Sequence, residues 1–365
     1  MHIDIERLIK DRDKLERMLS YTCNFRKHVE MGPYLSSINE MLMTLSPNDV
    51  HPELVRDARF ERQLLIHRKR LAFKHIDFLE KNEEFIIRML GSYNDILDEC
   101  DFSEYLYFDT LKTTFTEEEF KNMIYDFYSL FGNAFYKICK KYFDEGRIEM
   151  GYSIDNELGG FLGISAIKSG YIIAASDDLG TANMSTIIYE FGHAHDAEMF
   201  LFPQQKKINY NSDYLGEIPA IFFELMFIEY MKKNRIDGEG HSILLNERID
   251  FYSSFEGIFK TYYASDSGII NFDGDVELDN GDKFDIYQSI VYALGSYFAL
   301  HMCELYRSGD KNFQQNFLNF ISRRRETTLP ELVNMLGISL DEFLSGEIIK
   351  PRIVENSLVL KKRFG

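Results

Sequence analysis

The sequence predicts a mainly α-helical protein with one small β-sheet beside a central helix. Helical patterns fill residues 1 to about 143 apart from short breaks and return after residue 216, while glycine and serine are concentrated between residues 151 and 176. Only seven prolines occur in 365 residues and no low-complexity tract is present, which argues against long disordered linkers. A chain of this length forms two or three domains, or one large two-lobed domain.

The N-terminal residues 1–112 are expected to form a helical lobe, and residues 113–365 a second domain. Leu8, Leu15 and their neighbours approximate a helical stripe at the start of the chain. After a break, a charged helical segment runs to Leu97, with Gly91 as a candidate interruption or stop.

The next elements are predicted from caps and turns. Thr116, followed three residues later by Glu119, matches a capping box and predicts a helix to about Phe143. The apolar runs between residues 151 and 176 predict two or three strands with Ser169–Gly170 as a turn. This small sheet leads directly into a helix that carries Glu190 and His193.

The second half of the chain predicts further helices. One begins at Glu217 with Pro219 in its first turn and ends near Lys233. Asn280–Gly281 predicts a hairpin, and residues 286–307 form a tyrosine-rich helix. The remaining helices are indicated by caps and a stop, namely Thr328–Glu331, Gly337 and Ser339–Glu342.

The charge balance narrows the classes of function. The net charge is −18 and the pI is about 5.0, which disfavours nucleic-acid binding because that function needs a basic surface. The only dense basic run is Arg323–Arg325, which we expect to be a solvated helix end.

Features that mark a compartment point to the cytoplasm. The N-terminus is charged and lacks the apolar core of a signal peptide, and no apolar run reaches the length of a transmembrane helix. We therefore expect a cytoplasmic protein without a membrane partner. The cysteines lie far apart without a C-x-x-C pair, as expected for free thiols in a reducing compartment: Cys23, Cys100, Cys139 and Cys303.

The segment Thr186–Asp196 carries the pattern that points to chemistry. It matches the zinc-peptidase motif H-E-x-x-H, except that Tyr189 stands in place of the first histidine. In the intact motif two histidines on one helical face bind the metal, and the glutamate after the first is the general base on the metal-bound water. Glu190 and His193 keep their places.

A metal site of this kind needs a third ligand from a second helix. Glu217 follows His193 by 24 residues, which is enough chain to finish one helix, turn, and return antiparallel. Glu224 lies seven residues beyond Glu217, on the same face of that second helix.

These spacings resemble those of the thimet oligopeptidase and oligoendopeptidase F family of zinc peptidases, and are closer to the latter. The family pattern H-E-[FL]-G-H-x-x-H, followed after about 24 residues by E-[VI]-x-[SA]-x-x-x-E, is matched in part by Glu190–His193 and by Glu217–Glu224. The tyrosine-rich helix before Ala293-Leu294-Gly295 is also similar. The resemblance covers roughly residues 145 to 345.

The resemblance implies a two-lobed helical fold with a deep channel, a zinc cofactor, and short unfolded peptides as substrates. It implies that Glu190 is the general base and that His193 and Glu217 are metal ligands. It implies that Glu224 and Asp196 lie behind the metal ligands and that Tyr189 takes the remaining ligand position. It also implies that Tyr287 and Tyr292 contact the substrate carbonyl.

The departures from the family pattern alter several polar positions together. Asp196 replaces the last histidine of the motif, and Asp282 lies near a family histidine thought to stabilise the tetrahedral intermediate. His195 is one position off and about 200° around the helix from His193, so it should face away. Asp196 can share the face of His193, but its side chain is short.

Tyr189 changes the metal chemistry most. A free phenol has a pKa near 10 against roughly 6.5 for imidazole, so binding as phenolate costs roughly 4 kcal/mol in proton loss. His193 and Glu217 alone supply two good ligands, whereas catalytic zinc usually has three. We expect zinc binding to be weak or absent unless His195 or Asp196 substitutes.

The sequence leaves open whether the protein is an enzyme. One hypothesis is a metallopeptidase with an unusual His/Glu/Tyr site, favoured by four positions that keep the family's spacing: Glu190, His193, Glu217 and Glu224. The alternative is a catalytically inactive pseudopeptidase that binds peptide or a protein partner in the channel, favoured by Tyr189 and Asp282. A third is a helical scaffold in which Glu190 and His193 form an ordinary ion pair.

Overall fold

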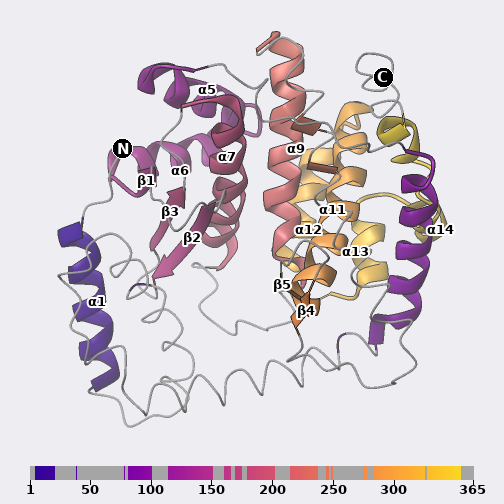
Figure 1. Cartoon of the computed structure of the whole chain (residues 1–365), viewed down its shortest axis with the longest axis horizontal. Coiled ribbons are helices and arrows are strands. Elements are labelled where there is room, and N and C mark those ends of the chain that lie inside the picture. The colour runs from indigo at the N-terminus through magenta and orange to yellow at the C-terminus, as the bar shows by residue number, and fades with distance from the viewer. Residues whose placement is uncertain are drawn as a thin grey trace. The chain divides into compact units, whose positions relative to one another are not determined.

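The computed structural model of the chain is mainly helical (Figure 1). It describes residues 5–20, 38, 78, 81–100, 114–150, 160–165, 169–174, 179–201, 214–236, 244–245, 248–249, 275–277, 283–324 and 327–354. Among these residues, none of the helices combines the length and the apolar character that crossing a bilayer requires.

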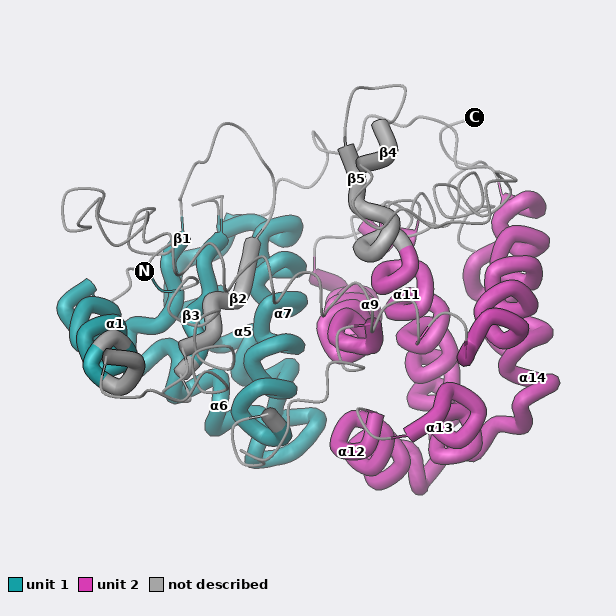
Figure 2. Tube along the Cα trace, turned by 90° about the horizontal axis from the view of Figure 1, so that it is seen from below, with its two compact units in different colours: residues 1–73, 114–206 teal, residues 74–113, 207–365 magenta. Residues whose placement is uncertain are grey.

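The chain divides into two compact units, each assembled from two separate stretches of sequence (Figure 2). Unit 1 comprises residues 1–73 and 114–206, and unit 2 comprises residues 74–113 and 207–365. The predicted boundary between residues 112 and 113 stays a prediction; the chain passes from unit 2 into unit 1 between Thr113 and Thr114.

Unit 1 contains four α-helices, a π-helical extension and three strands among its described residues: α1 (Ile5–Ser20), α5 (Glu117–Ser129), α6 (Asn133–Asp144), β1 (Ile148–Met150), β2 (Gly160–Ser165), β3 (Ser169–Ala174), α7 (Thr181–Asp196) and η2 (Ala197–Leu201). Unit 2 contains a helix over residues 81–97 and these labelled elements: α9 (Glu217–Asn234), β4 (Asp275–Glu277), β5 (Lys283–Asp285), α11 (Ile286–Arg307), α12 (Phe313–Arg323), α13 (Leu329–Met335) and α14 (Leu340–Ser345).

The small sheet of unit 1 has the strand order β1-β3-β2. β2 pairs antiparallel with β3, so the predicted strands are confirmed, but Ser169 and Gly170 belong to the ladder and not to a turn. Ser169 pairs with Ser165, and Gly170 pairs with Ile164. β3 therefore already begins at Ser169, because the pairing with β2 continues to that residue. β1 was not predicted; it runs parallel to β3 with Ile148 opposite Ile172.

The helices of unit 1 follow the predicted cap but not the predicted length. The Thr116 side chain accepts from the Glu119 backbone at 3.2 Å, and the Glu119 carboxylate accepts from the Thr116 backbone at 2.8 Å, which confirms the capping box. The single helix expected to Phe143 is instead two helices, α5 and α6. Gly132, with φ at +110°, breaks it in a conformation that side-chain-bearing residues avoid.

α7 lies against the sheet and against the α5–α6 pair. It contacts β2 and β3 on one side, which confirms the predicted sheet beside this helix. The buried Tyr128 hydroxyl of α5 donates to the Ile188 carbonyl at 2.9 Å, and the Tyr142 ring of α6 packs 5.6 Å from Phe191. α7 is therefore fixed by packing on its inner faces.

Unit 2 is built around α9, which is buried on nearly every face from Ile218 to Ile228. Such a helix lacks an apolar stripe because all its sides are core. Phe222 packs 4.7 Å from Phe317 of α12. α11 crosses α9 so closely that a Cβ added at Gly295 would lie 3.0 Å from the Glu217 Cβ.

Several other predictions for unit 2 are confirmed. α11 has the expected bounds, Pro219 lies in the first turn of α9, and β4 pairs antiparallel with β5 on either side of Asn280–Gly281, whose turn lies outside the described residues. Both C-terminal caps are present, at Thr328 and Ser339.

Two predictions for unit 2 are wrong. Gly91 neither ends nor interrupts a helix, because the helix over residues 81–97 runs through it and is held by buried neighbours such as Leu90 and Tyr93. Arg324 is not solvated: it is 1% exposed, and its guanidinium donates to the Ile321 carbonyl at the end of α12. Arg323 is exposed as expected, and Arg325 lies outside the described residues.

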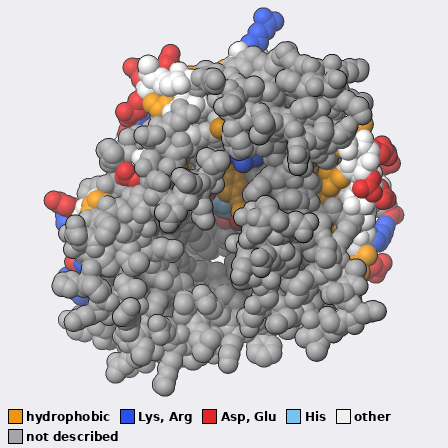
Figure 3. Space-filling model, viewed as in Figure 1, with side chains coloured by type: hydrophobic (Ala, Val, Ile, Leu, Met, Phe, Trp, Pro, Cys, Tyr) orange, Lys and Arg blue, Asp and Glu red, His pale blue; other side chains and the backbone are white. Residues whose placement is uncertain are grey.

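The described surface is consistent with an acidic protein. Figure 3 shows acidic side chains among the described residues at both margins of the face that it draws, which agrees with the net charge of −18. Three of the four cysteines are described, and all three are free thiols, as predicted: Cys100, Cys139 and Cys303.

Candidate functional site

Helix α7 presents Tyr189 and His193 on one side. Both side chains are half-buried, and their ring centroids lie 5.1 Å apart with the planes at 87°. This contact follows from the helix, because residues four apart lie one above the other. The tyrosine therefore lies where the intact motif would place the partner histidine.

His195 points to the opposite side of α7, as the helical periodicity predicts. It is 1% exposed, with Nδ1 2.6 Å from the Phe191 carbonyl oxygen and Nε2 3.0 Å from that of Phe135. Burial lowers the pKa of His195 to about 4, so the ring is neutral at pH 7. His195 is therefore held inside unit 1 by two backbone carbonyls, on the side of α7 away from His193.

The sulfur of Cys139 lies 3.6 Å from His195 Nε2. A cysteine beside a histidine is the arrangement of a nucleophilic pair, but this one has the wrong electrostatics. Burial raises the pKa of the Cys139 thiol well above its usual value and lowers that of His195, so both groups stay neutral. The pair is part of the core.

The two acidic residues of α7 are both buried. Glu190 is 2% exposed and Asp196 is 9% exposed. A carboxylate buried this far has to be hydrogen-bonded, paired or protonated. Glu190 follows Tyr189 directly on the helix, as the general base follows the first histidine of the motif.

Helix α9 carries the other two acidic residues of the predicted site. Glu217 is the first residue of α9 and is half-buried. Glu224 is 1% exposed, and its Oε1 lies 2.9 Å from Nε of the half-buried Arg248, an ion pair inside unit 2. The guanidinium of Arg248 therefore lies against one carboxylate oxygen of Glu224.

The two tyrosines assigned to the substrate carbonyl belong to α11. Tyr292 is half-buried, and nothing is described of the Tyr287 side chain, although its backbone is helical. Asp282 lies outside the described residues.

The predicted site draws on both units, since Tyr189, Glu190, His193 and Asp196 belong to unit 1 and Glu217, Glu224 and the tyrosines to unit 2. The convergence of His193 with Glu217 therefore stays a prediction. Among the residues that the structure describes, no three His, Cys, Asp or Glu side chains are grouped so that they could hold a metal ion.

The donors of α7 do not fit a catalytic zinc ion by themselves. The side that carries His193 offers one imidazole and one phenol, and the short side chain of Asp196 is buried at 9% exposure. A catalytic site needs three protein ligands. The phenol is protonated at neutral pH unless a metal removes its proton.

Sequence reasoning missed two partners of the candidate residues, Arg248 beside Glu224 and Cys139 beside His195. Neither has a local signal, since the members of each pair lie far apart in the sequence and meet only through tertiary packing. Helical periodicity placed His195 away from His193, and the apolar residues on every side of α9 would have indicated that Glu224 is buried. A buried glutamate calls for a cationic partner.

The fold has known counterparts. A candidate oligoendopeptidase F from Bacillus anthracis str. Ames is similar at 13% identity, with a TM-score of 0.51 over 92% of this chain and 59% of that one. PZ peptidase A with inhibitor 2 is similar at 11% identity, with a TM-score of 0.53 over 93% of this chain and 67% of that one. A further candidate oligoendopeptidase F, at 10% identity, gives a TM-score of 0.52 over 79% of this chain and 57% of that one.

These likenesses show a helical oligopeptidase-like fold. The chain spans only about 60% of the length of the B. anthracis protein. No protein-family model matches the sequence, and no curated protein does.

Proposed function

We propose that the chain is a peptide-binding protein on an oligopeptidase-like fold that does not hydrolyse the peptides it binds. The observation that carries the proposal is the placement of Tyr189 against His193, with both rings half-buried on one side of α7. At this position a zinc peptidase needs a donor that offers its lone pair without losing a proton. A phenol has to ionise first, at roughly 4 kcal/mol.

What the phenol offers at neutral pH is a hydrogen-bond donor. A tyrosine O–H pairs well with a peptide carbonyl, and the tyrosine ring adds apolar contact at low cost in conformational entropy. His193 next to it adds a ring nitrogen. The half-buried side of α7 is therefore suited to holding a peptide group and poorly suited to activating water.

The surrounding groups of unit 1 support the same function. β2 contacts α7 and is a terminal strand of the sheet as described. An extended peptide binds to such a strand through its backbone, with affinity from main-chain hydrogen bonds. This arrangement favours extended peptides over folded proteins, because an extended chain can pair with a strand through its backbone.

The Arg248–Glu224 pair favours loss of hydrolysis. In the peptidase hypothesis Glu224 lies behind the metal ligands and helps to orient them. Here Arg248, 2.9 Å away, competes for that carboxylate. An orienting carboxylate that is shared with an arginine is less available to a ligand side chain.

The retained Glu190, His193 and Glu217 support a second candidate function, a metallopeptidase in which the tyrosine binds zinc as phenolate. Both functions predict peptide binding, so hydrolysis separates them.

The test is a set of quenched-fluorescent peptides, assayed for binding by polarisation and for cleavage with zinc added. We expect saturable binding and no cleavage above that of Glu190→Gln. We expect Tyr189→Phe, which removes only the hydroxyl, to weaken peptide binding about threefold to tenfold, the effect of one hydrogen bond. Tyr136→Phe alters another half-buried tyrosine of unit 1 and serves as the matched control.

Cleavage that Glu190→Gln abolishes would refute the non-hydrolysing function and establish the metallopeptidase. Absence of saturable binding by every peptide would refute both.

A further inference from the structure

The accessible side of α7 is a single line of residues. Ala182, Thr186, Tyr189 and His193 are half-buried, whereas every other residue of this helix is buried. Their spacings of four, three and four residues place them on one face of an α-helix. Tyr189 and His193 are therefore the middle part of a longer surface, and a peptide held by them also meets the residues at its two ends.

This line of residues carries no aspartate, glutamate, lysine or arginine. The two acidic residues of α7, Glu190 and Asp196, are both buried. A peptide over this line meets hydrogen-bonding groups and uncharged surface, so its side chains are selected by shape and by apolar contact.

Phe200 extends the line beyond the end of α7. It belongs to the π-helical η2 and is half-buried. It follows His193 by seven residues, which is about two helical turns, and the wider turn of η2 displaces it by less than about a quarter of a turn. At a rise of about 1.5 Å per residue, Phe200 lies about 10 Å along the helix axis from His193. An aromatic ring therefore follows the two hydrogen-bonding residues on nearly the same side.

Ion pairs hold η2 in place. Nζ of Lys141 donates to both carboxylate oxygens of Glu198, at 2.9 and 2.8 Å. Nη1 of Arg147, a residue that is 2% exposed, lies 3.6 Å from the same carboxylate. Phe200 is two residues beyond Glu198 and is presented from an anchored turn, which lowers the entropy lost when a ligand binds against it.

We propose that Phe200 forms an apolar subsite at one end of the peptide-binding side of α7. The peptides that it accepts carry a bulky apolar residue about three positions from the residue held at Tyr189 and His193, because an extended chain advances about 3.3 Å per residue. The inference rests on the proposed function and names the class of peptide for the same site.

The opposite end of the line offers no such subsite. Its residues are Ala182 and Thr186, whose side chains are small. The Thr186 hydroxyl donates to the Ala182 carbonyl at 3.4 Å, so it is turned toward the helix backbone. A bulky apolar side chain gains little contact there, and the two ends of a bound peptide are therefore distinguished.

The competing explanation is that Phe200 only packs η2 against the rest of unit 1. In that case Phe200→Ala weakens the binding of every peptide to the same extent. Loss of a subsite weakens only the peptides that place an apolar side chain on it. The coupling between a substitution in the protein and a substitution in the peptide separates the two explanations.

The test uses seven-residue peptides of alanine and serine, acetylated and amidated, in which one phenylalanine is moved through every position. Their affinities are measured by competition with the fluorescent peptide that binds most tightly in the assay above. We expect phenylalanine near one end to raise the affinity about tenfold over the peptide without it, and phenylalanine near the other end to leave it unchanged. Phe200→Ala should remove the gain and change the affinity of the peptide without phenylalanine by less than about twofold.

Two variants of η2 complete the test. Phe200→Leu keeps an apolar side chain for the packing of η2 and should reduce the gain about threefold, the part that comes from contact between rings. Met199→Ala is the matched control, because Met199 is also half-buried in η2 but points about a quarter of a turn away from Phe200. It should retain the full gain.

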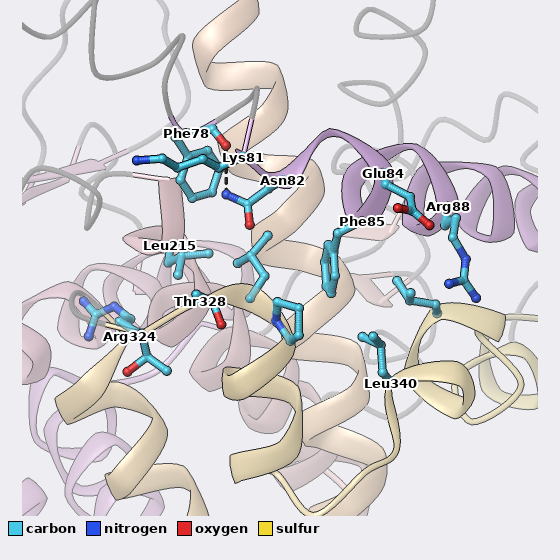
Figure 4. A pocket seen from close by; sticks show the side chains of 14 residues that line it. Phe78, Lys81, Asn82, Glu84, Phe85, Arg88, Leu215, Arg324, Thr328 and Leu340 are labelled. Carbon is cyan, nitrogen blue, oxygen red and sulfur yellow. Dashed lines mark hydrogen bonds between the residues drawn. The ribbon is translucent and has the colours of Figure 1, made fainter.

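The pocket of unit 2 supplies a control outside unit 1. It has a volume of about 700 Å³, and all its described lining residues belong to unit 2 (Figure 4). Charged side chains of both signs line it, namely Lys81, Glu84 and Arg88. Leu340→Trp places a large ring at the wall of this pocket and should leave the gain from phenylalanine unchanged.

Saturable binding with equal affinity for every position of the phenylalanine would overturn the subsite and leave the proposed function in place. An equal loss for peptides with and without phenylalanine in Phe200→Ala would also overturn the subsite, as would loss of the gain in Met199→Ala or Leu340→Trp. Absence of binding by every peptide would overturn the subsite together with the proposed function.

Discussion

Substitution of Gly295 by alanine tests the contact between α11 and α9. A Cβ at position 295 would lie 2.9 Å from Cδ1 of Ile221 and 3.0 Å from Cβ of Glu217. The first neighbour is the end of a flexible side chain and can move. The second is fixed to the first turn of α9, so part of the overlap can be relieved only by separating the helices.

Gly91 is the matched control in the same unit. It also lies in the middle of a helix, and a Cβ there would meet nothing within 4 Å. Alanine in place of a helical glycine gains about 1 kcal/mol in helix propensity at either position. Overpacking costs about 1–3 kcal/mol at Gly295 only. The difference in unfolding free energy between the two variants should therefore be about 1–3 kcal/mol, with Gly295→Ala the less stable.

The measurement is urea unfolding followed by far-UV circular dichroism, since the chain has no tryptophan. Ile221→Val removes the nearer clashing atom, so it should cost less in the Gly295→Ala background than in the wild type, with a coupling energy of at least about 0.5 kcal/mol. Equal stability of Gly295→Ala and Gly91→Ala, or strictly additive effects of the Gly295 and Ile221 substitutions, would refute the close approach of the helices.

Three further predictions concern stability. Burial lowers the pKa of His195 and of His301 to about 4, against about 6.5 in an unfolded chain. The unfolded state then binds more protons between pH 6.5 and 4, so the unfolding free energy should fall as the pH falls through this window. His195→Gln should reduce that fall, and an unchanged pH profile would contradict the assignment. Arg352 is 6% exposed and pairs with two glutamates at 2.7 and 3.0 Å. The substitution Arg352→Met should lower the free energy of unfolding by about 3–5 kcal/mol. Arg307→Met, which breaks a more exposed pair with one of the same glutamates, should cost at most about 1 kcal/mol, and urea midpoints compare the two. Thr116→Ala removes the cap of α5 and should lower the thermal midpoint through a loss of about 1 kcal/mol, whereas an unshifted midpoint would mean that the capping box is not formed in solution.

Local signals in the sequence were sufficient for elements that begin with a cap or a turn. Thr116, Thr328 and Ser339 begin helices where predicted because a cap is satisfied within three residues of its own position. The antiparallel pairing of β4 with β5 was predictable for the same reason, since a hairpin signal in the sequence is local.

Elements that depend on distant partners were not predictable in this way. β1 has only three residues, and it is a strand because β3 lies alongside. Gly91 costs about 1 kcal/mol in a helix, and the buried side chains around it outweigh that cost. Arg324 lies in a run of three arginines that predicts solvent, yet packing buries it.

The residues of the candidate site show the same difference between local signals and distant partners. The face of α7 follows from helical periodicity, so the directions of Tyr189, His193 and His195 were predictable from the sequence. The partner of Glu224 was not, because Arg248 meets it through tertiary packing. The convergence of His193 with Glu217 spans both units and stays a prediction.

The role of Tyr189 is tested most directly by comparing the zinc affinity of the wild type with that of Tyr189→His. If the phenol is what prevents metal binding, the wild type should bind zinc weakly, and Tyr189→His should bind it up to about a thousandfold more tightly, the equivalent of roughly 4 kcal/mol. Stoichiometric, tight zinc binding by the wild type, with no gain in Tyr189→His, would contradict the role given to Tyr189 and restore a working peptidase as the better hypothesis.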